Sequence, residues 1–376
     1  MTDKVIQLAA RVVSLAGPGK PADAVLRDVL RRERDPGLGG AREVSRTVFS
    51  FYRWRGWASP GAPVEQQIGE CCELARRFAQ TPEKFSDAEL SRAVPDWIRE
   101  AMEFTPEWLR SLQAEPALWL RAKRGQGNAL AQKLGDCWIP PEPRLADAVQ
   151  YRGEDDLFRS PEFHTGEFEI QDIASQLVGL LCDPQPGETW WDACAGEGGK
   201  TLHLSDLMAN KGLIWASDRA EWRLKHLKRR AGRAKCFNYR STLWDGGAKL
   251  PTKTTFDGVL VDAPCSGVGT WGRNPHARWT TTAKDVRELA AVQKQLLSHV
   301  ASGVRPGGKL IYAACTLTRA ETSGVTEWFS ADVEGFEPLA LNLNIERLVT
   351  SSPAITLWPQ QTGGNGMFVA AWRRRG

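Results

Sequence analysis

Residues 189–201 read TWWDACAGEGGKT, and this stretch decides the fold. An apolar strand reaches Asp192, a turn of small residues and glycine follows, and GKTLHLSDLMA (199–209) then has the pattern of a helix. Glycine lets the backbone approach a ligand closely, and the first turn of a helix offers free N–H groups to a carboxylate or a phosphate. The turn matches neither G-x-G-x-x-G nor G-x-x-x-x-G-K-S/T. Taken alone, it predicts a plain strand-to-helix connection as readily as a ligand site.

The chain on either side of this stretch alternates helices with buried strands. The predicted strands are 189–195, 212–218, 256–265 and 309–315, and the predicted helices are 170–181, 199–209, 221–230 and 286–302. This alternation is typical of a parallel sheet covered on both faces. Strand 212–218 ends in Asp218, which is placed to accept hydrogen bonds from a ribose diol, as acidic residues do in dinucleotide-binding folds. The glycine-rich turn and Asp218 together favour a nucleoside cofactor at the carboxyl edge of the sheet.

Two other strands bring cysteine to the same edge. The run FDGVLVD ends in Asp262 and continues through Pro264 to Cys265, and the run KLIYAA is followed by Cys315. A single cysteine is more simply interpreted as a small buried apolar side chain. Two cysteines at neighbouring strand ends, beside a cofactor turn and a carboxylate, instead predict thiol chemistry.

Methyl transfer to carbon 5 of cytosine is a reaction that needs such a set of groups. Carbon 5 is too weak a nucleophile to attack a sulfonium methyl group, but a thiolate that adds to carbon 6 makes the ring an enamine whose carbon 5 can attack. A carboxyl group near ring nitrogen 3 and the exocyclic amine would stabilise this adduct. The methylated adduct must then lose the carbon 5 proton and expel the thiol, a step that a second thiol can assist.

Read in chain order, the motifs resemble those of the RsmB/NOP/NSUN family of RNA 5-methylcytosine methyltransferases, from about residue 95 to the C-terminus. They are QDIAS (171–175), DACAGEGGKT (192–201), Asp218 with Arg223-Leu224, Asp245, DAPCSGVGT (262–270), RPGGKLIYAACTL (305–317) and LWPQQTGGNGMFVAAW (357–372). The resemblance implies an α/β, class I (Rossmann-like) methyltransferase domain with a mixed parallel sheet. It also implies S-adenosyl-L-methionine as cofactor and RNA as partner.

The resemblance carries a role for each matching residue. Cys315 would attack carbon 6, Cys265 would assist release, and Asp262 would be the carboxylate of the catalytic set. The cofactor would be held by Cys194, Ala195, Gly196, Glu197, Gly198, Gly199 and Lys200, together with Asp218, Arg223, Asp245 and Asp262. No metal is implied.

The chain departs from the family pattern at a few positions. Glu197 stands where a proline usually precedes the glycine pair, which adds a charge near the methionine moiety of the cofactor. Ala314 and Thr316 flank the predicted nucleophile in place of threonine and serine, and Asn365 replaces a common aspartate. None of these changes removes a catalytic group, so we expect an active enzyme.

Two smaller modules are predicted before the methyltransferase domain, which we place at residues 161–376. Residues 1–85 have helical apolar spacing and resemble the all-α NusB-like RNA-binding module of family members that modify small-subunit ribosomal RNA. Residues 95–160 resemble the family's small α+β RNA-recognition-like extension. On this pattern the substrate would be ribosomal RNA, and transfer RNA remains open.

The segment 41–57, AREVSRTVFSFYRWRGW, mixes arginine with aromatic residues. The arginines are Arg42, Arg46, Arg53 and Arg55, and the aromatic residues are Phe49, Phe51, Tyr52, Trp54 and Trp57. Such a mixture suits phosphate contact and base stacking. An amphipathic helix that buries its aromatic residues is an equally good interpretation.

Composition narrows the class of protein. The 376 residues are 42% hydrophobic and 25% charged, and no run approaches the roughly 18 apolar residues of a membrane span. The N-terminus lacks a secretory pattern, so we expect a cytoplasmic protein without a membrane partner. Eight cysteines without C-x2-4-C spacing favour reduced thiols over disulfides or structural zinc. The net charge of +4 permits a polyanionic partner. The sequence has no pattern of a coiled coil or a repeat, so we expect a monomer.

Two other functions remain open. One is a DNA cytosine methyltransferase that uses the Pro-Cys thiol, and the other is a catalytically silent RNA-binding or ribosome-assembly factor, suggested by Glu197 and the helical N-terminal module. The pairing of Cys265 with Cys315 favours the RNA enzyme over both.

Overall fold

The computed structural model describes residues 2–33, 37–345 and 348–376. The chain forms two compact units, one of Met1–Pro116 with Gly267–Asp285 and one of Ala117–Ser266 with Val286–Gly376. The segment directly after the Cys265 motif thus belongs to the same unit as the N-terminal helices. The three-module division at 1–85, 95–160 and 161–376 stays a prediction.

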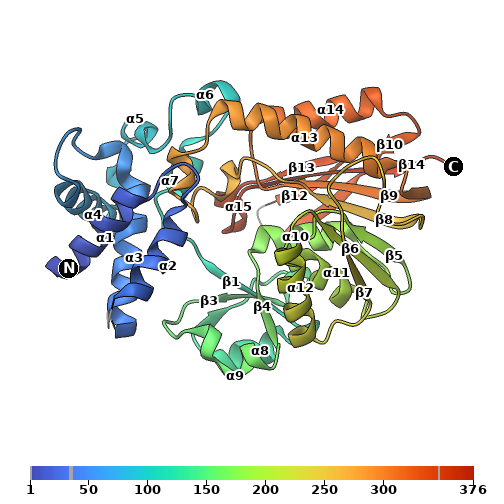
Figure 1. Cartoon of the computed structure of the whole chain (residues 1–376), viewed down its shortest axis with the longest axis horizontal. Helices are drawn as coiled ribbons and strands as arrows, with labels where there is room; N and C mark the ends of the chain where they lie inside the picture. The colour runs from blue at the N-terminus through green and yellow to red at the C-terminus, as the bar shows by residue number, and fades with distance from the viewer. Residues whose placement is uncertain (1, 34–36, 346–347) are drawn as a thin grey trace. The chain divides into compact units, whose positions relative to one another are not determined.

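The N-terminal part of the first unit is built from helices (Figure 1). They are α1 (Asp3–Leu15), α2 (Ala22–Arg32), α3 (Gly37–Trp54), α4 (Val64–Gln80), α5 (Asp87–Leu90), α6 (Ile98–Ala101) and α7 (Pro106–Ser111). In the arginine–aromatic segment, Phe51, Tyr52 and Trp54 of α3 are buried in the core of this unit. For these three side chains the amphipathic-helix interpretation is therefore correct, and they offer no surface to a base.

The segment Gly267–Asp285 is fixed to the first unit by one buried arginine. Both terminal nitrogens of Arg278 donate hydrogen bonds to backbone carbonyls, those of Arg53, Ala93, Leu112 and Trp271, at 2.9–3.2 Å. Burial, and then the charge of Arg53, lower the pKa of this guanidinium to about 9. Three of these carbonyls come from distant parts of the chain and the fourth, Trp271, from the segment itself, so Arg278 acts here as a structural cross-link.

The second unit begins with a small antiparallel sheet. Its strands are β1 (Leu118–Ala122), β2 (Cys137–Trp138), β3 (Ala148–Tyr151) and β4 (Phe168–Ile170), in the order β2-β3-β1-β4. Successive strand residues point to opposite faces. Leu120, Val149 and Phe168 pack with α8 (Gly127–Leu134) on one face, whereas Trp119 on the other face packs against the helix α10 (Ile173–Cys182). The helix α9 (Pro161–His164) precedes β4.

The large sheet is mixed, as predicted, with strand order β10-β14-β9-β8-β5-β6-β7 and β13 paired with β14. The strands β5 (Thr189–Asp192), β6 (Leu213–Asp218), β7 (Tyr239–Leu243), β8 (Phe256–Asp262) and β9 (Val304–Ala314) run parallel. The antiparallel strands are β10 (Phe336–Pro338), β13 (Ala354–Leu357) and β14 (Met367–Arg374). A separate hairpin joins β11 (Leu341–Ile345) and β12 (Leu348–Ser352). The Rossmann-like α/β fold predicted from the sequence is confirmed.

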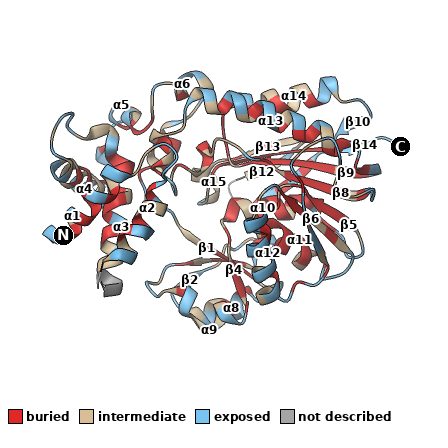
Figure 2. Ribbon diagram, viewed as in Figure 1, coloured by how far each residue is buried: buried red, intermediate tan, exposed pale blue. Residues whose placement is uncertain are grey.

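Helices cover both faces of this sheet (Figure 1). The helices α10, α11 (Gly199–Leu207) and α12 (Glu221–Ala234) lie on one face, and α13 (Ala283–Ala301) and α14 (Ser323–Asp332) lie on the other. Trp190 and Trp191 on β5 point to opposite faces and join different core clusters. The strands of the sheet are accordingly red in Figure 2. The short helix α15 (Pro359–Thr362) follows β13, and no helix in the described part of the chain is long and apolar enough to cross a membrane.

Candidate active site

The glycine-rich turn between β5 and α11 is the first component of the site. Gly198 caps α11 with φ +87°, and a Cβ there would lie 2.6 Å from Leu227 Cγ on α12. Only glycine fits both the left-handed conformation and this close approach. The turn thereby packs against α12 and exposes the backbone of Ala195 and Gly196 to a cavity in front of it.

Asp218, at the end of β6, fixes this turn. One carboxylate oxygen accepts a hydrogen bond from the Gly196 N–H at 3.0 Å, and the other accepts one from Ala220 N–H at 2.8 Å. The guanidinium of Arg223 lies 3.8 Å from the same carboxylate. Because each carboxylate oxygen can accept two hydrogen bonds, Asp218 keeps acceptor capacity for a ligand hydroxyl.

A cavity of about 510 Å³ lies in front of the turn. Among its lining residues are all but one of the predicted site residues: Cys194, Ala195, Gly196, Glu197, Gly199, Lys200, Asp218, Arg223, Asp245, Asp262, Cys265 and Cys315. Gly198 is the exception, because it faces α12. The volume is in the range of small-molecule and cofactor sites. The residues that the sequence singled out are thus brought together around one space.

Other residues that line the cavity were not predicted from the sequence. Trp244, Val292 and Leu296 supply apolar surface, and Ser175 supplies a hydroxyl. Ser175 could have been found, since it lies in the QDIAS motif. The apolar side chains carry no sequence signal that separates them from core residues.

The two cysteine thiols are neighbours. Cys265 Sγ and Cys315 Sγ lie 3.0 Å apart, and both cysteines are free of disulfides. Their proximity follows from the sheet, since β8 and β9 are adjacent parallel strands and Asp262 is in register with Ala313. The segments that follow these two strands begin at the same edge of the sheet, and each places its cysteine at that edge.

A partly buried ion pair lies beside the thiols. Lys200 Nζ donates a hydrogen bond of 2.6 Å to Asp262 Oδ2, and the lysine side chain is buried. Burial by itself lowers the pKa of this ammonium, but Asp262, helped by Cys315 and Asp192, raises the pKa above its ordinary value. Lys200 is therefore a fixed cation at the thiol pair, with Asp262 as its counter-ion.

Glu321, fully buried after β9, ties the two cysteine loops together. One carboxylate oxygen accepts hydrogen bonds from Ser266 N–H at 2.8 Å and Gln293 Nε2 at 3.0 Å. The other accepts from the hydroxyls of Ser266, Thr316 and Thr318. Gln293 also donates to the Pro264 carbonyl at 3.0 Å. The residues next to Cys265 and next to Cys315 are thus held by the same carboxylate.

Two charged side chains near the turn are in distinct environments. Asp192, at the end of β5, is fully buried and accepts a 2.6 Å hydrogen bond from Thr201; burial raises its pKa to about 7. Glu197, the departure from the family pattern, is exposed on the cavity rim, and its carboxylate lies 3.7 Å from His226 Nδ1 on α12. The extra carboxylate of Glu197 therefore lies in solvent, next to a side chain of α12.

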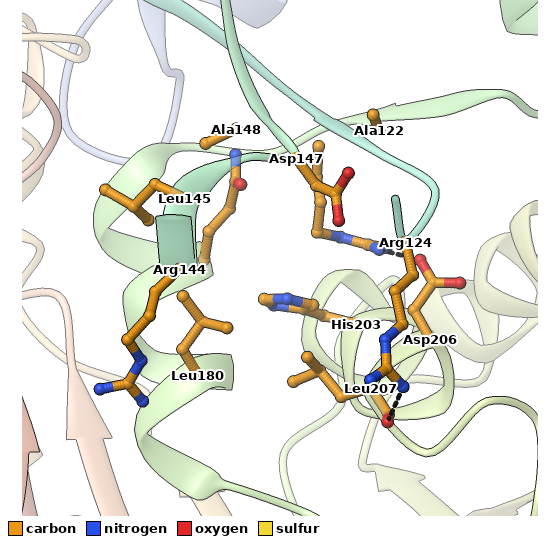
Figure 3. Close-up of a pocket in the computed structure, with 12 residues that line it drawn as sticks. Ala122, Arg124, Arg144, Leu145, Asp147, Ala148, Leu180, His203, Asp206 and Leu207 are labelled. Carbon is orange, nitrogen blue, oxygen red and sulfur yellow. Dashed lines mark hydrogen bonds and ion pairs between the residues drawn. The ribbon is translucent and has the colours of Figure 1, made fainter. Parts of the chain in front are cut away.

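A smaller cavity of about 50 Å³ lies between the small sheet and the helices α10 and α11 (Figure 3). His203 of α11 points into it, and the cavity is also lined by Arg124, Arg144 and Leu180. The imidazole is buried, and its Nδ1 has no hydrogen-bond partner among the described residues. Burial, followed by the charges of nearby Arg121 and Lys200, holds the pKa of His203 well below its ordinary value. The imidazole is therefore neutral.

A family model described as 16S rRNA methyltransferase RsmB/F matches residues 179–373, which is more than half of the chain. The chain belongs to this family. The RsmB/F family consists of methyltransferases that depend on S-adenosyl-L-methionine, so the cofactor predicted from the sequence is confirmed. The match runs from α10 to β14 and so includes the glycine-rich turn and both cysteines.

Curated relatives carry names of the same family. The chain is 36% identical over 216 residues to probable ribosomal RNA small subunit methyltransferase B of Synechocystis sp., covering 56% of this chain and 48% of the relative. It is 34% identical over 220 residues to the protein of that name from Bacillus subtilis, covering 57% and 49%. The match therefore spans about half the length of these curated relatives.

Solved structures share the fold of this RsmB/F family member. PH0851 superposes with a TM-score of 0.80 at 21% identity, covering 100% of this chain and 99% of that protein. NSun6 from Pyrococcus horikoshii, solved with SFG, superposes with a TM-score of 0.64 at 18% identity, covering 72% and 94%. At these identities the likeness shows the fold. Within the described residues, no group of three or more His, Cys, Asp or Glu side chains could hold a metal ion.

Proposed function

We propose that this RsmB/F family member transfers a methyl group from S-adenosyl-L-methionine to carbon 5 of a cytosine in RNA, with ribosomal RNA as the substrate. The observation that carries the proposal is the 3.0 Å approach of Cys265 Sγ and Cys315 Sγ beside the partly buried pair of Lys200 and Asp262. A pair of thiols next to a fixed cation and a carboxylate fits covalent activation of a pyrimidine better than direct methyl transfer to a nitrogen or oxygen.

The cavity suits the cofactor. S-adenosyl-L-methionine, when bound, supplies an electrophilic methyl group on its sulfonium. Asp218 retains acceptor capacity toward ribose hydroxyls, the turn 194–198 and the start of α11 offer backbone groups, and Trp244 adds an apolar wall. The volume of about 510 Å³ also leaves room for a base beside it. Asp218 and the turn are the residues that would hold the nucleoside.

The chain's own residues would divide the work as follows. The Cys315 thiolate adds to carbon 6 of cytosine, a sulfur–carbon bond forms, and the ring electrons become available at carbon 5. Lys200 stabilises the negative charge at this sulfur, since the two groups interact electrostatically. The Asp262 carboxyl group, which pairs with Lys200, would hydrogen-bond the ring nitrogen or the amine of the adduct. After methyl transfer, Cys265 acting as a thiolate would take up the carbon 5 proton. The electrons of that carbon–hydrogen bond re-form the double bond between carbons 5 and 6, and Cys315 leaves carbon 6 as a thiolate.

The helical N-terminal residues 1–85 and the small sheet within residues 95–160 would then contact RNA around the target. Transfer RNA is an alternative substrate for the same reaction. The other alternative is a catalytically silent RNA-binding or ribosome-assembly factor.

Product analysis tests the proposal. Purified protein is incubated with methyl-labelled S-adenosyl-L-methionine and unmethylated small-subunit ribosomal RNA, and the RNA is digested to nucleosides. We expect label in 5-methylcytidine, none with Cys315→Ala, and full label with Cys72→Ala, a partly buried cysteine on α4 outside the site. Label in any other nucleoside, or label that survives Cys315→Ala, would refute the chemistry. Failure to bind S-adenosyl-L-methionine would favour the silent factor.

A further inference from the structure

A second large cavity lies on the face of the small sheet that packs toward α10, and the proposed mechanism does not use it. The cavity is about 290 Å³ in volume. Its lining includes two tryptophans, two glutamines, an arginine and an isoleucine: Trp119, Trp138, Gln150, Gln361, Arg152 and Ile173. The combination of aromatic, amide and guanidinium groups in one hollow is unlike the apolar core on the other face of this sheet.

Strand register explains how these groups come together. Trp119 on β1 is the direct partner of Gln150 on β3, and Gln150 is the direct partner of Trp138 on β2. Direct cross-strand partners have side chains on the same face. Trp119, Gln150 and Trp138 therefore form one row across three strands, with the amide between the two indoles.

The two indoles differ in what they can do. Trp119 is 4% exposed, and its Nε1 donates a 2.9 Å hydrogen bond to the Gly363 carbonyl, so it is fixed as part of the wall. Trp138 is 39% exposed and meets Trp119 edge to face, with ring centroids 6.1 Å apart. Trp138 is thus partly accessible, and its contact with the buried Trp119 fixes the orientation of its ring.

The polar groups of the cavity complete a platform for a planar base. The guanidinium of Arg152 lies 5.5 Å from the Trp138 ring centroid and donates two hydrogen bonds to Gln150 Oε1, at 3.0 and 3.2 Å. The guanidinium thus lies over the Trp138 ring as a permanent cation, and it can pair with the phosphate of a nucleotide whose base contacts the indole. Gln361 lines the same cavity, and its amide oxygen is buried without a hydrogen-bond partner among the described residues. A bound group that donates to it would satisfy an otherwise costly acceptor.

This cavity adjoins the candidate active site. Ile173 lines the second cavity, and Ser175, two residues further on α10, lines the first. The segment that follows α15 is held in the same place, since Gly363 accepts from Trp119 and the Asn365 N–H donates to Asp172 at 3.0 Å. The first turn of α10 thus contributes a lining residue to each of the two cavities.

We propose that the cavity at Trp138 binds an unpaired base of the RNA substrate, close in sequence to the target cytosine, by stacking on the indole with Arg152 at the adjoining phosphate. The inference rests on the proposed function in one respect, namely that the substrate is RNA. It adds a second base-binding position, which would select targets in single-stranded or opened RNA.

The test measures RNA binding apart from methyl transfer. A short fluorescent single-stranded RNA with one cytosine is titrated with protein in the presence of S-adenosylhomocysteine, and binding is followed by anisotropy. Trp138→Ala should raise Kd about 10-fold, the usual effect of losing one base–aromatic stack. The matched control is Phe237→Ala, because Phe237 is 78% exposed and belongs to neither cavity. This control should bind like the unaltered protein.

An abasic series then locates the base. RNAs that lack one base at successive positions beside the cytosine are titrated with both proteins. At one position we expect the missing base to weaken binding to the unaltered protein about 10-fold and to have no further effect on Trp138→Ala. The inference is overturned if Trp138→Ala and Phe237→Ala behave alike, if the two losses add at every position, or if AMP displaces the RNA as well as unlabelled RNA does. If the unaltered protein does not bind RNA at all, it is the proposed function that fails.

Discussion

Replacing Glu321 should separate the positioning of the two cysteines from the binding of the cofactor. The Glu321 carboxylate accepts five hydrogen bonds in a fully buried place. Ser266 N–H and Gln293 Nε2 can only donate, whereas the three hydroxyls can turn and accept. Glu321→Gln can therefore keep its oxygen on the N–H side and donate to the hydroxyls, so the variant loses the charge and keeps most of the network.

The size of the effect follows from the strength of these bonds. A hydrogen bond to a charged group contributes about 1.5–3 kcal/mol and a neutral one about 1 kcal/mol, so Glu321→Gln should cost about 2 kcal/mol. In a unit of this size, that corresponds to a fall in Tm of about 4–8 °C. Glu321→Ala leaves Ser266 N–H and Gln293 unsatisfied and should cost about 4 kcal/mol. Since a misplacement of about 1 Å can lower a rate about 100-fold, the alanine variant should lose about that much in kcat.

The assay compares three quantities in parallel: Tm, kcat for methyl transfer and Kd for S-adenosylhomocysteine. Glu321 does not line the cofactor cavity, so Kd should stay within about twofold, well below the tenfold that corresponds to about 1.4 kcal/mol. Glu327→Gln, an exposed carboxylate on α14, is the matched control and should change none of the three. A folded Glu321→Ala protein with the kcat of the unaltered protein would refute the positioning role. A loss of kcat that only tracks a loss of cofactor binding would also refute it.

Three further predictions concern the cofactor turn and the buried groups around it. Asp218→Asn should raise the Kd for S-adenosylhomocysteine about tenfold in calorimetry, because a charge-assisted bond to the ribose is weakened; an unchanged Kd would remove Asp218 from the binding role. Burial raises the pKa of Asp192 from 3.8 in the unfolded chain to about 7 in the folded protein, so its protonated form favours folding. This contribution of about 4 kcal/mol to stability is complete below about pH 4 and is lost as the pH rises through 7. Asp192→Asn should remove that difference, so it should be more stable than the unaltered protein at pH 8 in urea unfolding, and equal stability there would contradict the buried acid. Because the pKa of His203 is lowered in the folded protein, protonation of the unfolded chain should reduce the free energy of unfolding as the pH falls below about 6.5. In His203→Asn this loss of stability at acid pH should be smaller, whereas stability at pH 8 should be unchanged.

Four of the five parallel strands of the large sheet, β5, β6, β8 and β9, could be predicted because they are largely apolar runs. The fifth, β7, was not predicted, because its side chains are exposed or only partly buried and form no apolar run. The strands β10 to β14 were not predicted. They are short or antiparallel. The strands β10 and β13 pair with β14, β14 pairs with β9, and β11 and β12 pair with each other, and single-sequence periodicity does not reveal such pairing. The assignment of Gly267–Asp285 to the first unit was equally out of reach, because it depends on Arg278 finding carbonyls far away in the chain.

The candidate site was predictable to the extent that it lies at strand ends. Cys265 and Cys315 follow adjacent strands, so their approach is a consequence of topology. The support around them was not predicted. The five hydrogen bonds to Glu321 come from the loops after β8 and β9 and from α13, and only the folded chain brings these donors to one carboxylate. The same holds for the row of Trp119, Gln150 and Trp138, which needs the register of three strands.

In the proposed mechanism, Cys315 attacks the base and Cys265 assists release. Trapping the covalent adduct is the most direct test of this assignment. Cys265→Ala protein is incubated with RNA and S-adenosyl-L-methionine, denatured and separated on a gel, and the protein residue bound to RNA is mapped by mass spectrometry. We predict an RNA–protein complex that resists denaturation, attached through Cys315, and no complex with the double variant Cys265→Ala, Cys315→Ala. Free turnover by Cys265→Ala without a resistant complex, or attachment through any residue other than Cys315, would contradict the account.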